Sequence, residues 1–213
     1  MSLYSMGHVG LSLIQALVFM VGLMRRKTLV TSVSLLLVAS SVYDNALIGF
    51  GSTIGAGESL TILSYVRFYT HWAFVPFLLL PAAVFVAPRR NQWLVPATGV
   101  VAAVLSVVEV KEGFFTEKGL ILAPLEFYGM LRMVSASEVK IPIITIAVNV
   151  VLLIVGALMR SQSSLLRGSL AALIGNAIPS SMVGPLPGTI GEALLYASIL
   201  KTETSLLTIR RDD

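Results

Sequence analysis

Long apolar runs dominate the sequence, separated by short stretches that are charged or rich in glycine and proline. A helix needs about 20 mostly apolar residues to cross the hydrocarbon core of a bilayer. Seven runs are candidates for such helices, and the last of them is short: residues 8–24, 28–50, 60–87, 93–110, 141–159, 166–181 and 189–200. The pattern predicts an all-α chain that forms one polytopic membrane helix bundle over residues 1–213, with a last helix that is tilted or only partly spanning.

The stretch 111–140 is ambiguous, because its apolar part, Leu120 to Met133, is short for a membrane span. If this stretch does not cross the membrane, the inner side collects ten Lys and Arg residues. The outer side then holds four, namely Lys111, Lys118, Arg132 and Lys140. Since cytoplasmic loops carry the excess of positive charge, we expect seven helices with the N-terminus outside and the C-terminus inside. The stretch 111–140 is then an outer loop or a re-entrant segment.

Composition supports a multi-pass integral membrane protein and narrows its chemistry. The chain is 56% hydrophobic and 12% charged, with a mean hydropathy of +0.88, whereas soluble domains contain roughly 25% charged residues. It has no cysteine and two histidines, which excludes disulfides and thiolate metal sites and argues against structural zinc. The net charge of +4 is explained by topology. We expect no metal, no cofactor and no nucleic-acid partner, and the oligomeric state stays open.

The third apolar run carries two polar side chains that are costly in hydrocarbon. Arg67 and His71 are four residues apart, so they share one face of a helix. Burying an arginine in a membrane helix costs on the order of 3 kcal/mol even on lenient scales. Asp44 lies between Tyr43 and Asn45 in the outer part of the preceding run. It is the expected partner of Arg67.

On the seven-helix topology, strongly polar residues from six helices fall in the same outer half of the membrane. They are Asp44, Asn45, Arg67, His71, Glu109, Asn149, Asn176 and Glu192. Residues that only pack helices together would be spread over both halves. The pattern therefore predicts one polar cavity, open to the outer side and capped by residues 51–58 and 111–140, where Glu126 lies.

Each of these residues also has a purely structural interpretation. Asp44 and Arg67 could be a buried pair that fixes the register of two helices, and His71 could be a hydrogen-bonded core residue. The later asparagines fit interhelical hydrogen bonds, and the aromatic residues of the third run fit packing. Glu109 could reach interfacial water, and Glu192, at a helix start rich in proline and glycine, could be a cap.

An acidic, aromatic-lined cavity in a membrane favours an enzyme that acts on a lipid or isoprenoid substrate. Carboxyl groups in an apolar pocket can stay protonated and act as general acids, and aromatic faces can steady a cationic intermediate. We expect a cyclase or isomerase, hence a lyase- or isomerase-type step in terpene or lipid biosynthesis. The candidate catalytic residues are Asp44, Glu192, His71 and Glu109. The candidate substrate-binding residues are Tyr43, Asn45, Arg67, Trp72, Asn149, Asn176 and Glu126.

In size and expected span count, the chain resembles the small integral-membrane terpene cyclases, which is a likeness of architecture. The alternative is a proton-coupled small-molecule transporter, because intramembrane Asp, Glu, His and Arg also build proton relays. The Gly- and Pro-rich break between Asn176 and Glu192 fits a transporter site. Two features argue against a transporter: the inner half of the predicted bundle lacks polar groups, and the sequence has no visible inverted repeat. A retinal protein is disfavoured because the last helix has no mid-membrane lysine; Lys201 lies at its inner end.

Overall fold

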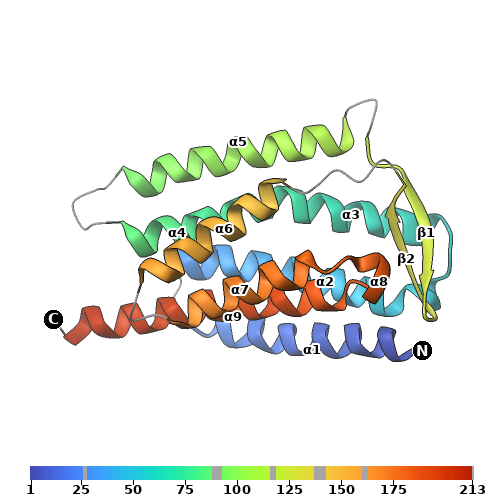
Figure 1. Cartoon of the computed structure of the whole chain (residues 1–213), viewed down its shortest axis with the longest axis horizontal. Coiled ribbons are helices and arrows are strands. Elements are labelled where there is room, and N and C mark those ends of the chain that lie inside the picture. Colours follow the sequence, from blue (N-terminus) through green and yellow to red (C-terminus); the bar gives the residue numbers. More distant parts are fainter. Residues whose placement is uncertain (26–27, 88–92, 116–118, 137–142, 160–162, 213) are drawn as a thin grey trace.

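The computed structural model describes residues 1–25, 28–87, 93–115, 119–136, 143–159 and 163–212, and it is mostly helical (Figure 1). In chain order the elements are α1 (Leu3–Leu23), α2 (Leu29–Ile54), α3 (Glu58–Phe74), η1 (Val75–Leu78), α4 (Leu79–Val86), α5 (Leu94–Phe114), β1 (Leu122–Phe127), β2 (Met130–Ser135), α6 (Ile143–Leu158), α7 (Ser163–Ala177), α8 (Ser180–Val183) and α9 (Leu186–Asp212). Because α3, η1 and α4 follow one another without a break, seven helical segments of at least 15 residues make up most of the described chain.

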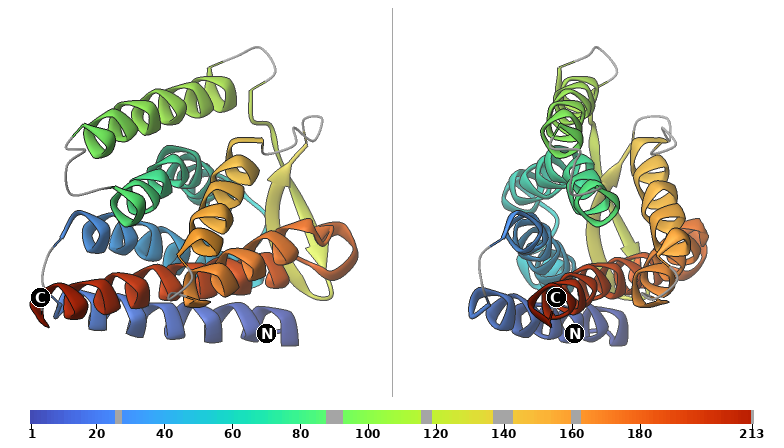
Figure 2. Two further views of the ribbon diagram at one scale, coloured as in Figure 1. Left: turned by 60° about the vertical axis from the view of Figure 1, so that its left-hand side comes forward. Right: turned by 90° about the vertical axis from the view of Figure 1, so that its left-hand side faces the viewer.

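The long helices run roughly along one axis, and the two strands stand across one end of them (Figures 1 and 2). α2 is central, since it contacts α1, α3, α4, α9 and β2. α5 lies at one edge, against α3, η1 and α4. The main core joins the middle helices through Leu37 and Val38 of α2, Leu152 of α6, Leu165 of α7 and Ile199 of α9. These elements leave the polar side chains of α2, α3, α5 and α9 facing one another near the strands.

Four helical segments are long and apolar enough to cross a membrane: Leu3–Leu23, Leu29–Ile54, Glu58–Val86 and Leu94–Phe114. A fifth apolar helix, Ile143–Leu158, is shorter. Large apolar side chains also cover much of the outer surface. On α5, for example, Val100, Val104 and Val107 are each more than half exposed, although soluble proteins avoid large apolar patches. These features indicate membrane association.

The helix boundaries differ from the sequence prediction in three places. α2 continues to Ile54, so the predicted turn 51–58 shrinks to three residues between α2 and α3. The third segment tightens into a 3₁₀ turn at Val75–Leu78, where Pro76 has no N–H to donate. α9 begins at Leu186, so it contains the end of the Gly- and Pro-rich break as well as the predicted run 189–200. Pro187 is tolerated there because the first helical turn needs no backbone donor.

The prediction of an all-α chain missed a β-hairpin. Residues 122–135 form two antiparallel strands in which Leu122 pairs with Ser135 and Phe127 with Met130. The two linking residues, Tyr128 and Gly129, both have positive φ, 47° and 73°, which is the geometry of a two-residue hairpin turn. The stretch 111–140 is therefore the end of α5 followed by a hairpin. Lys118 and Lys140, and the inner residues Arg26, Lys27, Arg89, Arg90 and Arg160 that entered the topology prediction, lie outside the described residues.

The hairpin is fastened to the end of α2. A Cβ atom on Gly51 would lie 1.9 Å from the carbonyl oxygen of Leu131, so only glycine permits this approach. Next to it, the Ser52 hydroxyl donates to the carbonyl oxygen of Gly129 (2.9 Å) and accepts from the backbone N–H of Leu131 (2.9 Å). β2 is thereby held beside the polar side chains of α2 and α3.

Candidate functional site

A cavity of about 660 Å³ lies between α2, α3, α5, α9 and the hairpin. This volume lies within the usual range for small-molecule sites. All four candidate catalytic residues line it, together with two of the candidate substrate-binding residues: Asp44, His71, Glu109, Glu192, Arg67 and Trp72. Apolar side chains such as Leu37 and Ile144 complete the wall. The structure therefore brings together side chains that are up to 148 positions apart in the sequence (Asp44 to Glu192).

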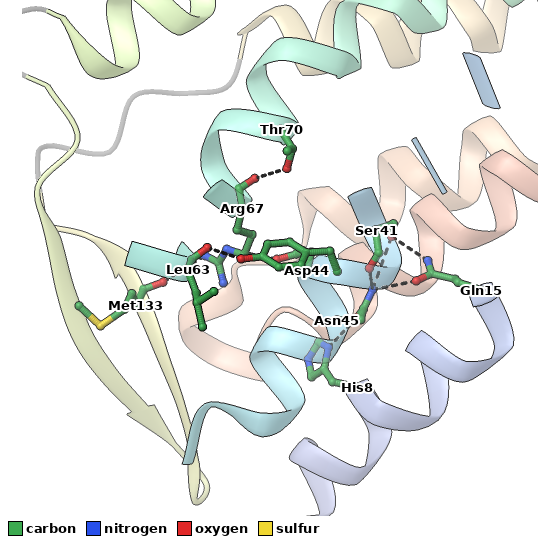
Figure 3. A network of polar contacts seen from close by, with 10 residues as sticks. His8, Gln15, Ser41, Asp44, Asn45, Leu63, Arg67, Thr70 and Met133 are labelled. Carbon is green, nitrogen blue, oxygen red and sulfur yellow. Dashed lines mark hydrogen bonds and ion pairs between the residues drawn. The ribbon is translucent and has the colours of Figure 1, made fainter. Parts of the chain in front are cut away.

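Asp44 and Arg67 form the ion pair that the sequence predicted (Figure 3). Arg67 Nε lies 3.1 Å from Asp44 Oδ1, and the two side chains are 10% and 26% exposed. Arg67 Nη2 also donates to the carbonyl oxygen of Met133 in β2 (3.1 Å). The guanidinium carbon lies 4.5 Å from the ring centre of Phe68, a cation–π distance. The arginine thus links α2, α3 and the hairpin at the edge of the cavity.

Arg132 is a cavity residue that sequence analysis missed. It was counted as an outer loop charge, but on β2 it is only 9% exposed and lines the cavity. Its nearest described polar partner is the hydroxyl of Ser180, 3.5 Å from Nη2, and its Nε has no hydrogen-bond partner within the described chain. A strand assignment would have identified it, because alternate residues share a face and Met130 is buried.

The charge state of Arg132 follows from its surroundings. Burial lowers the pKa of the guanidinium to about 10, Arg67 acts in the same direction, and Asp44 opposes both. The group therefore remains charged at neutral pH. Two arginines and one aspartate share this part of the cavity, so it carries net positive charge.

Further polar residues of the cavity come from α3, α5 and α9. His71 and Trp72 are half-buried on α3, and Glu192 and Tyr196 lie one helical turn apart on α9. Asp44 and His71 are close enough to Glu192 to influence its charge, and Asn176 of α7 is its hydrogen-bonding neighbour. Tyr196 was not predicted, although its spacing of four residues from Glu192 places both on one helix face. Glu109 and Glu112 enter the cavity from α5.

Five candidate substrate-binding residues do not line this cavity. The Tyr43 hydroxyl donates to the carbonyl oxygen of Leu63 (2.8 Å), and Asn149 is buried in α6, where it donates to the carbonyl oxygen of Thr145 (2.9 Å). Glu126 is exposed on β1, and Asn176 is exposed at the end of α7. Asn45 is buried on the other side of α2, facing α1.

Asn45 belongs to a closed polar network between α1 and α2 (Figure 3). Its Oδ1 accepts from His8 Nδ1 (2.7 Å), and its Nδ2 donates to Gln15 Oε1 (3.1 Å) and to the carbonyl oxygen of Ser41 (2.9 Å). Gln15 Nε2 in turn donates to Ser41 Oγ (2.7 Å). His8, Asn45 and Gln15 are at most 2% exposed. Sequence analysis missed the α1 side of this network, although Ser5, His8, Ser12 and Gln15 recur every three or four residues.

A second, apolar groove of about 540 Å³ lies between α1 and α9. Small residues, Gly7 and Gly10 of α1 and Ala193 of α9, leave it open, and Leu186 and Ile190 line it. Tyr196 lines both this groove and the polar cavity. One aromatic side chain therefore borders the two spaces.

At the opposite end of α9, Glu203 forms a polar cluster that sequence analysis also missed. It is 8% exposed and accepts hydrogen bonds from the hydroxyls of Thr28 and Thr31, the latter at 2.7 Å. The predicted last run ended at residue 200, so Glu203 was not considered. The half of the bundle away from the hairpin therefore does contain a strongly polar group.

Within the described residues, no group of three or more His, Asp or Glu side chains is arranged to hold a metal ion. Comparisons of the chain with protein-family models, with curated proteins and with solved structures find no match. Function must therefore be inferred from the geometry and chemistry of the site itself.

Proposed function

We propose that this protein is a multi-pass membrane enzyme that acts on a lipid or isoprenoid by acid–base chemistry of the cyclase or isomerase type. One observation carries the proposal: Asp44, His71, Glu109 and Glu192 come from four segments distant in sequence and line one cavity. Seven spans with the N-terminus outside and the C-terminus inside place this cavity and the hairpin on the outer side. Titratable groups that converge in a cleft are a mark of a functional site.

The proposed roles follow from the partner of each group. Glu192, beside apolar wall residues and Tyr196, is the general acid and donates its proton to a carbon–carbon double bond of the substrate. A C–H bond forms and leaves a carbocation, which the aromatic faces of Trp72 and Phe68 steady. Asp44, paired with Arg67, is the base.

The reaction ends when the cation loses a proton from an adjacent carbon, directly or after ring closure. Asp44 accepts this proton, and His71 of α3, which lines the same cavity, relays it back to Glu192. The product is an isomer of the substrate, so neither oxidant nor co-reactant is consumed.

A lipid substrate accounts for the apolar surroundings of the cavity. The groove between α1 and α9 and the cavity share Tyr196 as a wall residue, so movement of this side chain would let a hydrocarbon chain in the groove present its polar end to the acidic residues. The apolar outer surface of the helices gives such a substrate access from the bilayer.

The test is conversion of a membrane lipid extract by the purified full chain in nanodiscs, followed by chromatography and mass spectrometry. We expect wild-type protein to convert one species into a product of equal mass and different retention time, and Asp44→Asn to leave that species unchanged. No conversion by the wild type, or equal conversion by both proteins, would overturn the proposal.

A proton-coupled small-molecule transporter is the second candidate, and Glu203 is the observation that favours it. Glu192 and Glu203 are eleven residues apart on one helix, or about 16 Å at 1.5 Å per residue. Buried carboxyl groups toward both ends of a bundle are what a proton path requires. Solute uptake into proteoliposomes that depends on a pH gradient and is abolished by Glu203→Gln would favour the transporter over the enzyme.

A further inference from the structure

Two arginines from different elements meet at the hairpin end of the cavity. Arg67 comes from α3 and Arg132 from β2, and both line the cavity. The carbonyl oxygen of Met133, the residue next to Arg132, accepts a hydrogen bond from Arg67. Arg132 is within electrostatic range of both Arg67 and Asp44. Each of the two residues is about nine-tenths buried, so the two like charges repel each other in surroundings that screen them poorly.

Within the described chain, only one of these two charges is directly paired with a carboxylate. Asp44 pairs with Arg67, but within the described chain no carboxylate pairs with Arg132. Its Nη2 atom lies 3.5 Å from the Ser180 hydroxyl, and its Nε atom has no hydrogen-bond partner there. A buried guanidinium that is charged and under-bonded is costly, and this one faces open space. Arg132 is therefore placed to donate a hydrogen bond to an anion that enters the cavity.

We propose that Arg132, together with Arg67, binds the phosphate or diphosphate group of a phosphorylated lipid. The lipid part of this assignment rests on the proposed function, whereas the oxyanion site rests on the arginines alone. A guanidinium offers a planar fork of donors that matches phosphate oxygens. The acidic cavity residues Glu109, Glu112 and Glu192 come from α5 and α9, on elements that carry neither arginine, so the oxyanion and the acid have separate supports.

The shape of the site fits a ligand with a charged head and a long apolar tail. α9 starts near the hairpin, and Glu192 and then Tyr196 lie progressively farther from that start (Figure 1). A head group held by Arg132 would place the first carbons of the chain beside Glu192. The chain could then continue past Tyr196 into the apolar groove.

Binding to the full chain in detergent micelles tests the assignment, with geranylgeranyl diphosphate and the uncharged geranylgeraniol as probes. Quenching of Trp72, a cavity residue, reports occupancy. We expect wild-type protein to bind the diphosphate at least about 10-fold more tightly than the alcohol, and Arg132→Gln to remove this preference. The matched control is Arg167→Gln, because Arg167 is exposed on α7 and bonds only to Ser163 of its own helix in the described chain; it should keep the preference.

Equal affinity of the wild type for both probes, or a preference that survives Arg132→Gln, would overturn the oxyanion site. If inorganic diphosphate displaced the fluorescence change as effectively as the prenyl diphosphate, the lipid assignment would be wrong and the ligand would be a soluble oxyanion. These outcomes are independent of product formation. Failure of the proposed enzyme activity can therefore be told apart from failure of this site.

A second measurement uses wild-type protein and does not depend on the folding of a variant. Phenylglyoxal modifies arginines, and peptide mass spectrometry locates each adduct. We expect geranylgeranyl diphosphate to protect Arg132 and Arg67 and to leave Arg167 reactive. Equal modification of Arg132 with and without the ligand would contradict the proposal.

Discussion

Asp44 and Asn45 are neighbours on α2, yet they belong to two polar regions of opposite character (Figure 3). Asn45 faces α1 in a closed network with His8, Gln15 and Ser41, in which the side chains bond to one another and are almost fully buried. Asp44 faces a cavity, shares it with Arg67, and remains 26% exposed. In the first region the side chains bond mainly to one another, with His8 Nε2 the atom left without a partner in the described chain, whereas the second region borders an open cavity.

The difference shows how polar residues in a membrane helix divide between structure and function. Successive helix residues are about 100° apart, so adjacent positions readily serve different faces. A satisfied network specifies how two helices pack. A set of charges that is incompletely satisfied and borders open space is suited to a ligand. The predictions below test whether the two regions respond to mutation in these two different ways.

The largest expected effect is on turnover, when the cavity loses its acid. Glu192→Gln keeps the size of the side chain but removes its proton, so we expect the turnover of the proposed reaction to fall at least about 100-fold, the usual contribution of a general acid. The melting temperature should stay close to that of the wild type. Glu58→Gln, at an exposed position that starts α3, is the control and should keep full turnover. A similar loss in both variants would argue against a specific acid.

The next effect concerns stability and belongs to the closed network. Asn45→Ala leaves the buried polar groups of His8 and Gln15 without their partner, which should lower the free energy of unfolding by about 2 kcal/mol. Turnover per folded molecule should not change. Asn149→Ala is the matched comparison, because Asn149 donates only within its own helix in the described chain, and its loss should cost less than about 1 kcal/mol. Unfolding in mixed micelles measures the free energy of unfolding of both variants. Equal losses would mean that the network between α1 and α2 is no more important for stability than a hydrogen bond within one helix.

A smaller effect is expected where the hairpin meets α2. Gly51→Ala places a methyl group where the Leu131 carbonyl lies, so β2 must shift and carry Arg132 with it. We expect the affinity for geranylgeranyl diphosphate to fall about 10-fold, as on losing one charged hydrogen bond. Gly57→Ala is the control, because nothing lies within 4 Å of its Cβ position. Unchanged affinity in Gly51→Ala would mean that the hairpin does not position the oxyanion site.

The smallest effect is a dependence on alkaline pH. Only protonated Arg132 attracts an oxyanion, and its pKa of about 10 is below the ordinary value of an arginine. Affinity for geranylgeranyl diphosphate should therefore be constant up to about pH 9 and fall by up to about tenfold at pH 11, where most of the guanidinium has lost its proton. Affinity for geranylgeraniol should not change over this range. Parallel changes for both probes would instead report alkaline unfolding.

Much of the fold and part of the site could be predicted from sequence. Apolar runs identified the helices, and the cost of a buried charge identified Arg67 and its partner Asp44. The hairpin was not predicted, because its strands within residues 122–135 look like a short apolar run in the sequence. The place of Arg132 in the cavity was missed for the same reason. Asn45 was predicted to line the cavity with Asp44, but its side chain faces α1. The sequence alone does not show which neighbouring helix a polar side chain faces. Such directions depend on which helices become neighbours, and a single sequence does not record this.

The most direct test compares lipid retained per folded molecule in Asp44→Asn and in Asn45→Ala, measured by native mass spectrometry after gentle extraction and exposure to a membrane lipid extract. Asp44→Asn removes a carboxylate and Asn45→Ala removes an amide, from adjacent residues that lie on different faces of α2. We expect Asn45→Ala to retain wild-type occupancy in its folded fraction and Asp44→Asn to hold more of a phosphorylated lipid than the wild type, because the change frees Arg67 from its competing carboxylate. Equal occupancy in the two variants, or wild-type protein that holds no specific lipid, would contradict the assignment of the cavity as the lipid site.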